Sequence, residues 1–165
     1  MTTNKKKQSY HTSQLSRSTS QSSTPASLFC MVELHVSDFK KTKSFYIKLG
    51  FEVVWERFSD GFKGYLVMKL ENNVICFWGG NEDIYQHDYF SRFSSDTPKG
   101  FGVELVLLVK DLEPLYRRVK NMGIICEKLQ VRPWGVRDFR VLDPWGFYLR
   151  FSDPHNILSD ENAVK

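Results

Sequence analysis

An internal repeat constrains the fold of this chain more than any other feature of its sequence. An alternating run of apolar residues leads to Asp38, and a stretch with helical periodicity then ends at Gly50. A second run and a second helical stretch end in the same way at Asp111 and Gly123, and each pair of landmarks is 73 positions apart. Because self-similarity at a fixed spacing indicates duplicated structural units, the chain is expected to contain two copies of one module.

Local signals define the elements of each module. Residues 31–38 and 104–111 alternate at period two, which is typical of a half-buried strand, and helices are predicted over 39–48 and 112–121. An Asp before a helix can accept the free amide protons of the first turn, and a Gly after it can adopt the left-handed conformation. Three further strands are predicted after each helix, at 51–58, 64–70 and 74–78 and then at 124–129, 137–142 and 147–151.

The predicted fold class is therefore α+β, with two tandem βαβββ modules. A four-stranded sheet with one helix covers only one of its faces, so two such sheets can pair and enclose a cavity. The segment between the modules, residues 79–100, is longer than an ordinary connection and carries several aromatic residues and a histidine. Long connections in compact domains are usually binding loops, lids or linkers.

The alternation also assigns residues to the two faces of each sheet. In the first strand it directs Glu33 and His35, with Met31, toward the cavity, and in the fifth it directs Glu104 there. Tyr148 and Arg150 are expected on the same face as Glu104. The positions expected under the helices are apolar: Val32, Leu34, Val36, Leu105, Leu107 and Val109.

The charge distribution argues against a nucleic-acid partner. The net charge of +4 arises within residues 1–27, which hold three Lys, one Arg and no acid, so the remainder has 19 basic and 19 acidic residues. This segment is rich in Ser, Thr and Gln and is predicted to be a disordered tail, with a transit peptide or a phosphate-binding arm as alternatives.

No apolar run approaches the roughly 20 residues of a membrane-spanning helix, and no signal peptide is evident, so a cytoplasmic location without a membrane partner is expected. The three cysteines, Cys30, Cys76 and Cys126, are widely spaced and lack a CxxC pair. Reduced thiols are therefore expected, rather than a disulfide framework or a thiolate zinc site.

Three stretches resemble the vicinal oxygen chelate superfamily of glyoxalases, extradiol dioxygenases and bleomycin resistance proteins. They are ELHVSDFKKTKSFYIKLGFEV, its copy LVLLVKDLEPLYRRVKNMGI, and RPWGVRDFRVLDPWGFYLRFSDP. The resemblance covers residues 29–154 and implies a domain at 28–158, with modules at 29–80 and 101–154 and a C-terminal tail at 159–165. The Pro-Trp-Gly segment with Trp134, followed by Arg137 and Phe139, is similar to the bleomycin resistance branch, which sequesters a drug without chemistry.

The resemblance also indicates where a metal would bind. Metal-dependent members carry one ligand seven residues before each helix-capping Asp and another four residues after the turn glycine of each module. The matching positions here are Met31, Glu104, Arg150 and Phe77, with Cys76 next to Phe77. Divalent cations prefer imidazole, carboxylate or thiolate donors, and a guanidinium repels them. No metal and no other cofactor is therefore expected.

The favoured function is that of a metal-free protein that sequesters a small, partly aromatic ligand. The folded part is neutral, unlike the strongly acidic bleomycin resistance proteins, whose ligand is a cation. Glu104 and Arg150 either neutralise each other or leave Arg150 available to a polar ligand group. The resemblance further implies a homodimer. The candidate ligand-binding residues are Trp55, Trp78, Glu104, Trp134, Arg137, Phe139, Tyr148 and Arg150.

The alternative function is that of an enzyme, a lyase or a dioxygenase-like oxidoreductase. His35 and Glu33 lie on one strand face and are the candidate catalytic residues for general acid–base chemistry. An unexpected metal at Glu104 is the other form of this alternative. A histidine that is merely hydrogen-bonded to a nearby carboxylate would produce the same sequence pattern.

Overall fold

The computed structural model describes residues 31–58 and 60–156. The predicted tails at 1–27 and 159–165 lie outside these residues, as does Cys30. Within the described part, neither α-helix is long and apolar enough to cross a bilayer.

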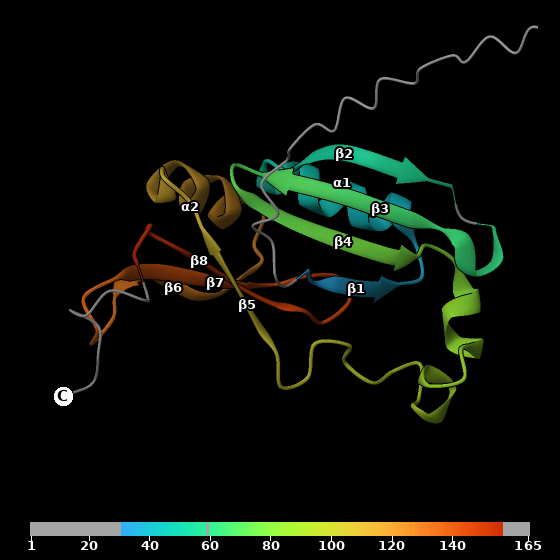
Figure 1. The fold of residues 1–165 in the computed structure, drawn as a ribbon. Helices are drawn as coiled ribbons and strands as arrows, with labels where there is room; N and C mark the ends of the chain where they lie inside the picture. Colours follow the sequence, from blue (N-terminus) through green and yellow to red (C-terminus); the bar gives the residue numbers. More distant parts are fainter. Residues whose placement is uncertain (1–30, 59, 157–165) are drawn as a thin grey trace, which may run out of the picture.

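The first module forms a mixed four-stranded sheet with one helix against it (Figure 1). Its strands lie in the order β1-β4-β3-β2, with β1 parallel to β4 and the other neighbours antiparallel. Its elements are β1 (Glu33–Val36), α1 (Phe39–Leu49), β2 (Glu52–Arg57), the short 3₁₀ helix η1 (Gly61–Lys63), β3 (Tyr65–Leu70) and β4 (Asn73–Gly79).

The second module repeats this arrangement, with the strand order β5-β8-β7-β6 and β5 parallel to β8. Its elements are β5 (Glu104–Leu108), α2 (Leu112–Asn121), β6 (Ile125–Val131), β7 (Arg137–Leu142) and β8 (Tyr148–Ser152). The α+β class with two tandem βαβββ modules is thus confirmed. The predicted strand ends differ from the observed ones by at most three residues.

One of the two predicted N-terminal helix caps is present, and the other is absent. The Lys41 amide donates to Asp38 Oδ1 at 3.0 Å, and Gly50 has the left-handed φ of 100° that suits glycine. The prediction that the Asp111 side chain caps α2 is wrong, because it accepts no hydrogen bond there. The third helical residue of α2 is Pro114, which has no amide proton to donate.

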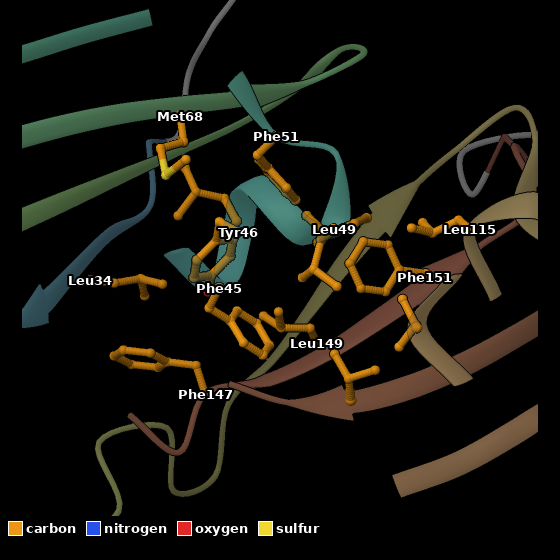
Figure 2. Packing of buried hydrophobic residues seen from close by; sticks show 14 of the residues in the cluster. Leu34, Phe45, Tyr46, Leu49, Phe51, Met68, Leu115, Phe147, Leu149 and Phe151 are labelled. Carbon is orange, nitrogen blue, oxygen red and sulfur yellow. The ribbon is translucent and has the colours of Figure 1, made fainter. Parts of the chain in front are cut away.

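The two modules share one hydrophobic core, which lies on the helix side of both sheets. Figure 2 shows Phe45 and Leu49 of α1 in the same cluster as Leu149 and Phe151 of β8. Polar contacts also join the modules: the Tyr46 hydroxyl donates to Asp143 Oδ2 at 3.0 Å. The face of each sheet that points away from its helix lies outside this core, and we call it the open face.

The burial pattern follows the predicted alternation with one exception. Leu34, Val36, Leu107 and Val109 are buried and Leu105 packs against the core, as predicted. Val32 is 37% exposed, so its predicted place under the helix is wrong. Val32 precedes the first residue of β1 and lines a cavity instead.

Candidate functional site

The open face of the first sheet gathers polar and aromatic side chains from three strands. Glu33 and His35 of β1 lie on it, because Leu34 and Val36 between them face the core. The register places Cys76 beside Glu33 and Trp78 beside His35, and Tyr65 of β3 pairs with Trp78. All five residues lie on the open face of the first sheet.

His35 and Glu33 are in contact, as a general acid–base pair would require. Their Nε2 and Oε1 atoms are 3.4 Å apart, and the imidazole meets the rings of Trp78 and Phe90 edge-on at centroid distances of 4.9 and 4.4 Å. Burial lowers the pKa of His35 below 6.5 although Glu33 opposes the shift, so the imidazole is neutral at pH 7. Burial and hydrogen bonds to Cys76 and Glu33 raise the pKa of Tyr65.

A cavity of about 610 Å³ adjoins His35 and lies beside β1 and β5. It is bordered by residues 80–103 between β4 and β5, here called the connecting segment, which contains the 3₁₀ helices η2 (Glu82–Gln86) and η3 (Phe90–Arg92) and runs from β4 to β5 in Figure 1. Apolar groups dominate the cavity wall, and its polar members include Glu33, His35 and Lys99. Six aromatic side chains line it: Tyr85, Tyr89, Phe90, Phe93, Phe101 and Phe147.

The open face of the second sheet holds Glu104, Tyr148 and Arg150, as the alternation predicts. The register pairs Glu104 with Tyr148 and Val106 with Arg150. Glu104 nevertheless has a nearer partner than Arg150. The Arg140 Nε–H donates to Glu104 Oε1 at 2.6 Å, whereas Arg150 Nη1 lies 3.7 Å from Glu104 Oε2.

Arg140 also connects Glu104 to a wider ionic network. Its Nη1 donates to Asp138 at 3.0 Å and to Glu127 at 3.1 Å, and Arg132 bonds to the same two carboxylates. The Tyr148 hydroxyl donates to Glu127 Oε1 at 2.8 Å, and this bond, with one from Arg132, lowers the pKa of Glu127. The network contains three acids and three guanidinium groups, so its formal charges cancel: Glu104, Glu127, Asp138, Arg132, Arg140 and Arg150.

Two buried atoms of this network are unsatisfied within the described part of the chain. They are Asp138 Oδ2 and Arg150 Nε. Arg150 is therefore the least completely paired of the three guanidinium groups.

The remaining candidate residues are distributed over several places. Trp55 of β2 is 50% exposed on the open face of the first sheet, and its ring centroid lies 6.0 Å from that of Tyr65. Trp134 is exposed in the turn between β6 and β7.

Phe139 and Arg137 are not brought to either open face. Phe139 is fully buried against Tyr116 of α2, and Arg137 forms a bidentate pair with Asp153 at 2.7 and 3.0 Å. Their neighbours Asp138 and Arg140 occupy the open face, so the period of two directs Phe139 to the core.

Sequence reasoning missed several residues of these faces. Arg140 and Asp138 could have been found from the alternation in β7, where Phe139 and Val141 are apolar and their neighbours are charged. The same alternation in β3 would have assigned Tyr65 to the open face. Lys99 had no signal, because only the tertiary fold places the connecting segment against β1.

The chain belongs to the Glyoxalase/Bleomycin resistance protein/Dioxygenase superfamily, because the model of that family matches residues 29–151, most of its length. A search of curated protein sequences finds no match.

Solved structures resemble the fold of the chain at low sequence identity. A bleomycin-binding protein complexed with bleomycin is 19% identical with a TM-score of 0.54, covering 76% of this chain and 98% of its own. A bleomycin resistance determinant encoded on the transposon Tn5 is 21% identical with a TM-score of 0.55, covering 77% and 98%. A glyoxalase family protein from Enterococcus faecalis is 24% identical with a TM-score of 0.55, covering 78% and 98%. At these identities the similarity shows the fold alone.

The residues at the metal-ligand positions do not fit a divalent cation. Phe77 is fully buried on the helix side of its sheet, so the neighbouring Cys76, which lies beside Glu33, is the residue of that strand on the open face. Met31 is a weak thioether ligand. Glu104 is bonded to Arg140, and Arg150 lies beside it. A cation bound there would have to break the Arg140 contact and remain next to a second guanidinium.

Proposed function

We propose that this protein binds a small, partly aromatic molecule without a metal ion and sequesters it, as the bleomycin resistance branch does. The observation that carries the proposal is the 2.6 Å bond from Arg140 to Glu104. The only carboxylate among the matched metal-ligand positions is committed to a guanidinium. The fold of a bleomycin-binding protein supports the sequestering role, because it holds a ligand on the same architecture.

The side chains around His35 suit such a ligand. Trp78 and Tyr65 are partly exposed on the open face of the first sheet, and Trp55 is half-exposed beside them. Aromatic side chains around a concave surface hold flat ligands by stacking and by burying apolar area.

We also propose that the protein is a homodimer that pairs open faces. These faces expose apolar side chains that a monomer leaves in water: Trp55 at 50%, Val74 at 43%, Val106 at 40% and Leu142 at 48%. Pairing the faces of two copies would bury this surface and enclose a ligand between them.

A ligand screen on chelator-treated protein tests the binding function. Thermal-shift measurements against a library of aromatic small molecules should yield ligands that raise the melting temperature, because a ligand that binds only the folded state stabilises it by mass action. Added Zn²⁺, Ni²⁺, Mn²⁺ or Fe²⁺ should change neither the melting temperature nor the binding. Ligands that bind only after a metal is restored would contradict the proposal.

The contact between His35 and Glu33 favours a second candidate, metal-free acid–base catalysis. The neutral imidazole next to a carboxylate and a cavity could accept a proton from a bound substrate. If this function holds, His35→Gln should lower turnover about a hundredfold while ligand binding survives. If the protein only sequesters its ligand, product analysis should find the ligand unchanged with wild type and variant.

A further inference from the structure

We propose that the cavity beside the connecting segment binds an aromatic molecule that carries an anionic group, with the Lys99 ammonium as the partner of the anion. This inference rests on the proposed binding function and names the class of ligand. It assigns the aromatic body to the cavity wall and the charged group to one side chain.

The wall of the cavity selects an apolar, flat body. Phe90, Phe93, Phe147 and three further aromatic rings line it, together with aliphatic side chains such as Leu34 and Leu105. Its volume of about 610 Å³ lies within the roughly 300–1,000 Å³ of small-molecule sites. Few polar groups interrupt this wall, so each of them determines which ligand chemistry the cavity accepts.

Of the charged groups in the wall, only Lys99 remains available to a ligand. Glu33 is bonded to His35, and it accepts a second hydrogen bond from Tyr65. His35 is neutral at pH 7 because burial lowers its pKa. None of the ion pairs formed by the described residues includes Lys99.

The position of Lys99 is fixed from both sides. Its Nζ lies 4.4 Å from the centroid of the Tyr85 ring, in a cation–π contact. Its backbone amide donates to the Trp145 carbonyl at 3.3 Å. The next residue, Gly100, is buried so closely on the second module that an added Cβ would lie 2.4 Å from the Gly146 carbonyl oxygen. The backbone at Lys99 is thus anchored to the second module, and the Tyr85 ring contacts one side of the ammonium.

An ammonium in this position favours anions and disfavours cations. A carboxylate, sulfonate or phenolate could take up its free N–H donors in a charge-assisted hydrogen bond within a low-dielectric wall. An aromatic ligand with a positive charge would be repelled by the same group. The cavity therefore differs from an aromatic cage for ammonium ligands, which has rings but no lysine.

Two fluorescent probes with the same skeleton separate the charge from the aromatic body. 8-Anilinonaphthalene-1-sulfonate carries a sulfonate, and N-phenyl-1-naphthylamine lacks it. The wild-type protein should bind the sulfonate probe more tightly. Lys99→Met should weaken the sulfonate probe about tenfold and leave the neutral probe unchanged, whereas Lys99→Arg should retain binding. Phe93→Ala should weaken both probes, because each buries its rings against the cavity wall.

Lys41→Met is the matched control. Lys41 also lies over a tryptophan ring, that of Trp145 at 4.5 Å, but it does not line the cavity. This variant should bind both probes as the wild type does. Melting temperatures of all variants show whether each is folded.

Each other outcome overturns the inference. Equal affinities for the two probes, with Lys99→Met changing neither, would refute the anion preference and leave the binding function intact. An equal loss in Lys41→Met would show that the sulfonate responds to surface charge. Failure of both probes to bind folded wild type would reject the cavity as the site, and the ligand screen would then judge the binding function separately.

Discussion

At the scale of single residues, Arg140 holds together the charges of the second open face. Its guanidinium contacts three carboxylates, and its side chain is 9% exposed. Removing one partner from a buried ionic network strands the others in a medium that solvates them poorly. Arg140 therefore matters more for stability than Arg150, whose nearest carboxylate oxygen is 3.7 Å away.

We predict that Arg140→Met lowers the free energy of unfolding by about 3–5 kcal/mol, because Glu104 loses its nearest guanidinium and Asp138 and Glu127 keep only Arg132. Urea denaturation measures the loss. Arg137→Met is the control and should cost at most about 1 kcal/mol, since its pair with Asp153 lies at the surface. Arg150→Met should fall between the two. A loss in Arg140→Met no larger than that in Arg137→Met would refute the role of Arg140.

His35 should make stability depend on pH. Its pKa is lower in the folded state than the ordinary value of 6.5, so the unfolded chain binds more protons just below pH 6.5. The stabilisation is fully present above pH 6.5 and is lost as the pH falls toward the pKa of the folded state. We predict that His35→Gln loses less stability than the wild type between pH 7 and pH 5. The urea denaturation midpoints of both proteins, measured at the two pH values, give the two losses. Parallel pH profiles would contradict this account.

At the scale of elements, the repeat predicts the architecture because each copy carries its own turn and helix signals. The alternating runs, together with Gly50 and Gly123, locate each strand of both modules within three residues of its observed bounds. The prediction failed at Asp111, whose side chain caps no amide, and Pro114 removes one of the two amide protons that such a cap can accept. This failure could have been avoided from the sequence.

The candidate site was predicted less well than the fold. Phe139 was assigned to the ligand by resemblance, although its alternation with Asp138 and Arg140 places it in the core. Partners within the ionic network and the place of Lys99 depend on contacts between distant segments. A local pattern specifies which face a residue occupies, but not which charge on a neighbouring strand is nearest.

The turn from β4 into the connecting segment should tolerate no side chain at Gly79. Its φ is 95°, and an added Cβ would lie 2.1 Å from Ile84 Cγ2. We predict that Gly79→Ala lowers the free energy of unfolding by about 1–3 kcal/mol and weakens ligand binding, because η2 must move. Gly135→Ala is the control that measures only the cost of a positive φ for alanine, since its φ is 82° and an added Cβ would meet nothing within 4 Å. Equal losses in the two variants would show that packing against Ile84 contributes nothing.

At the scale of the whole molecule, both open faces lie on the outside of a core that the two modules share. We predict that the protein sediments as a dimer and that Val106→Glu, which places a charge on the open face of β5, shifts it toward monomer. Ile47→Glu is the control, because Ile47 is 53% exposed on α1 and away from the open faces. Sedimentation equilibrium of the three proteins provides the measurement. A wild-type monomer, or a dimer unaffected by Val106→Glu, would contradict the proposed pairing.

The central claim is that this fold binds its ligand without a metal, and calorimetric titration tests it most directly. Chelator-treated protein, shown by elemental analysis to hold less than about a tenth of an equivalent of transition metal per chain, is titrated with the tightest ligand from the thermal-shift screen. We predict saturable binding whose affinity is unchanged when Zn²⁺, Ni²⁺, Mn²⁺ or Fe²⁺ is restored, with the ligand recovered intact. Binding that appears only with the metal, or conversion of the ligand to a product, would contradict the account.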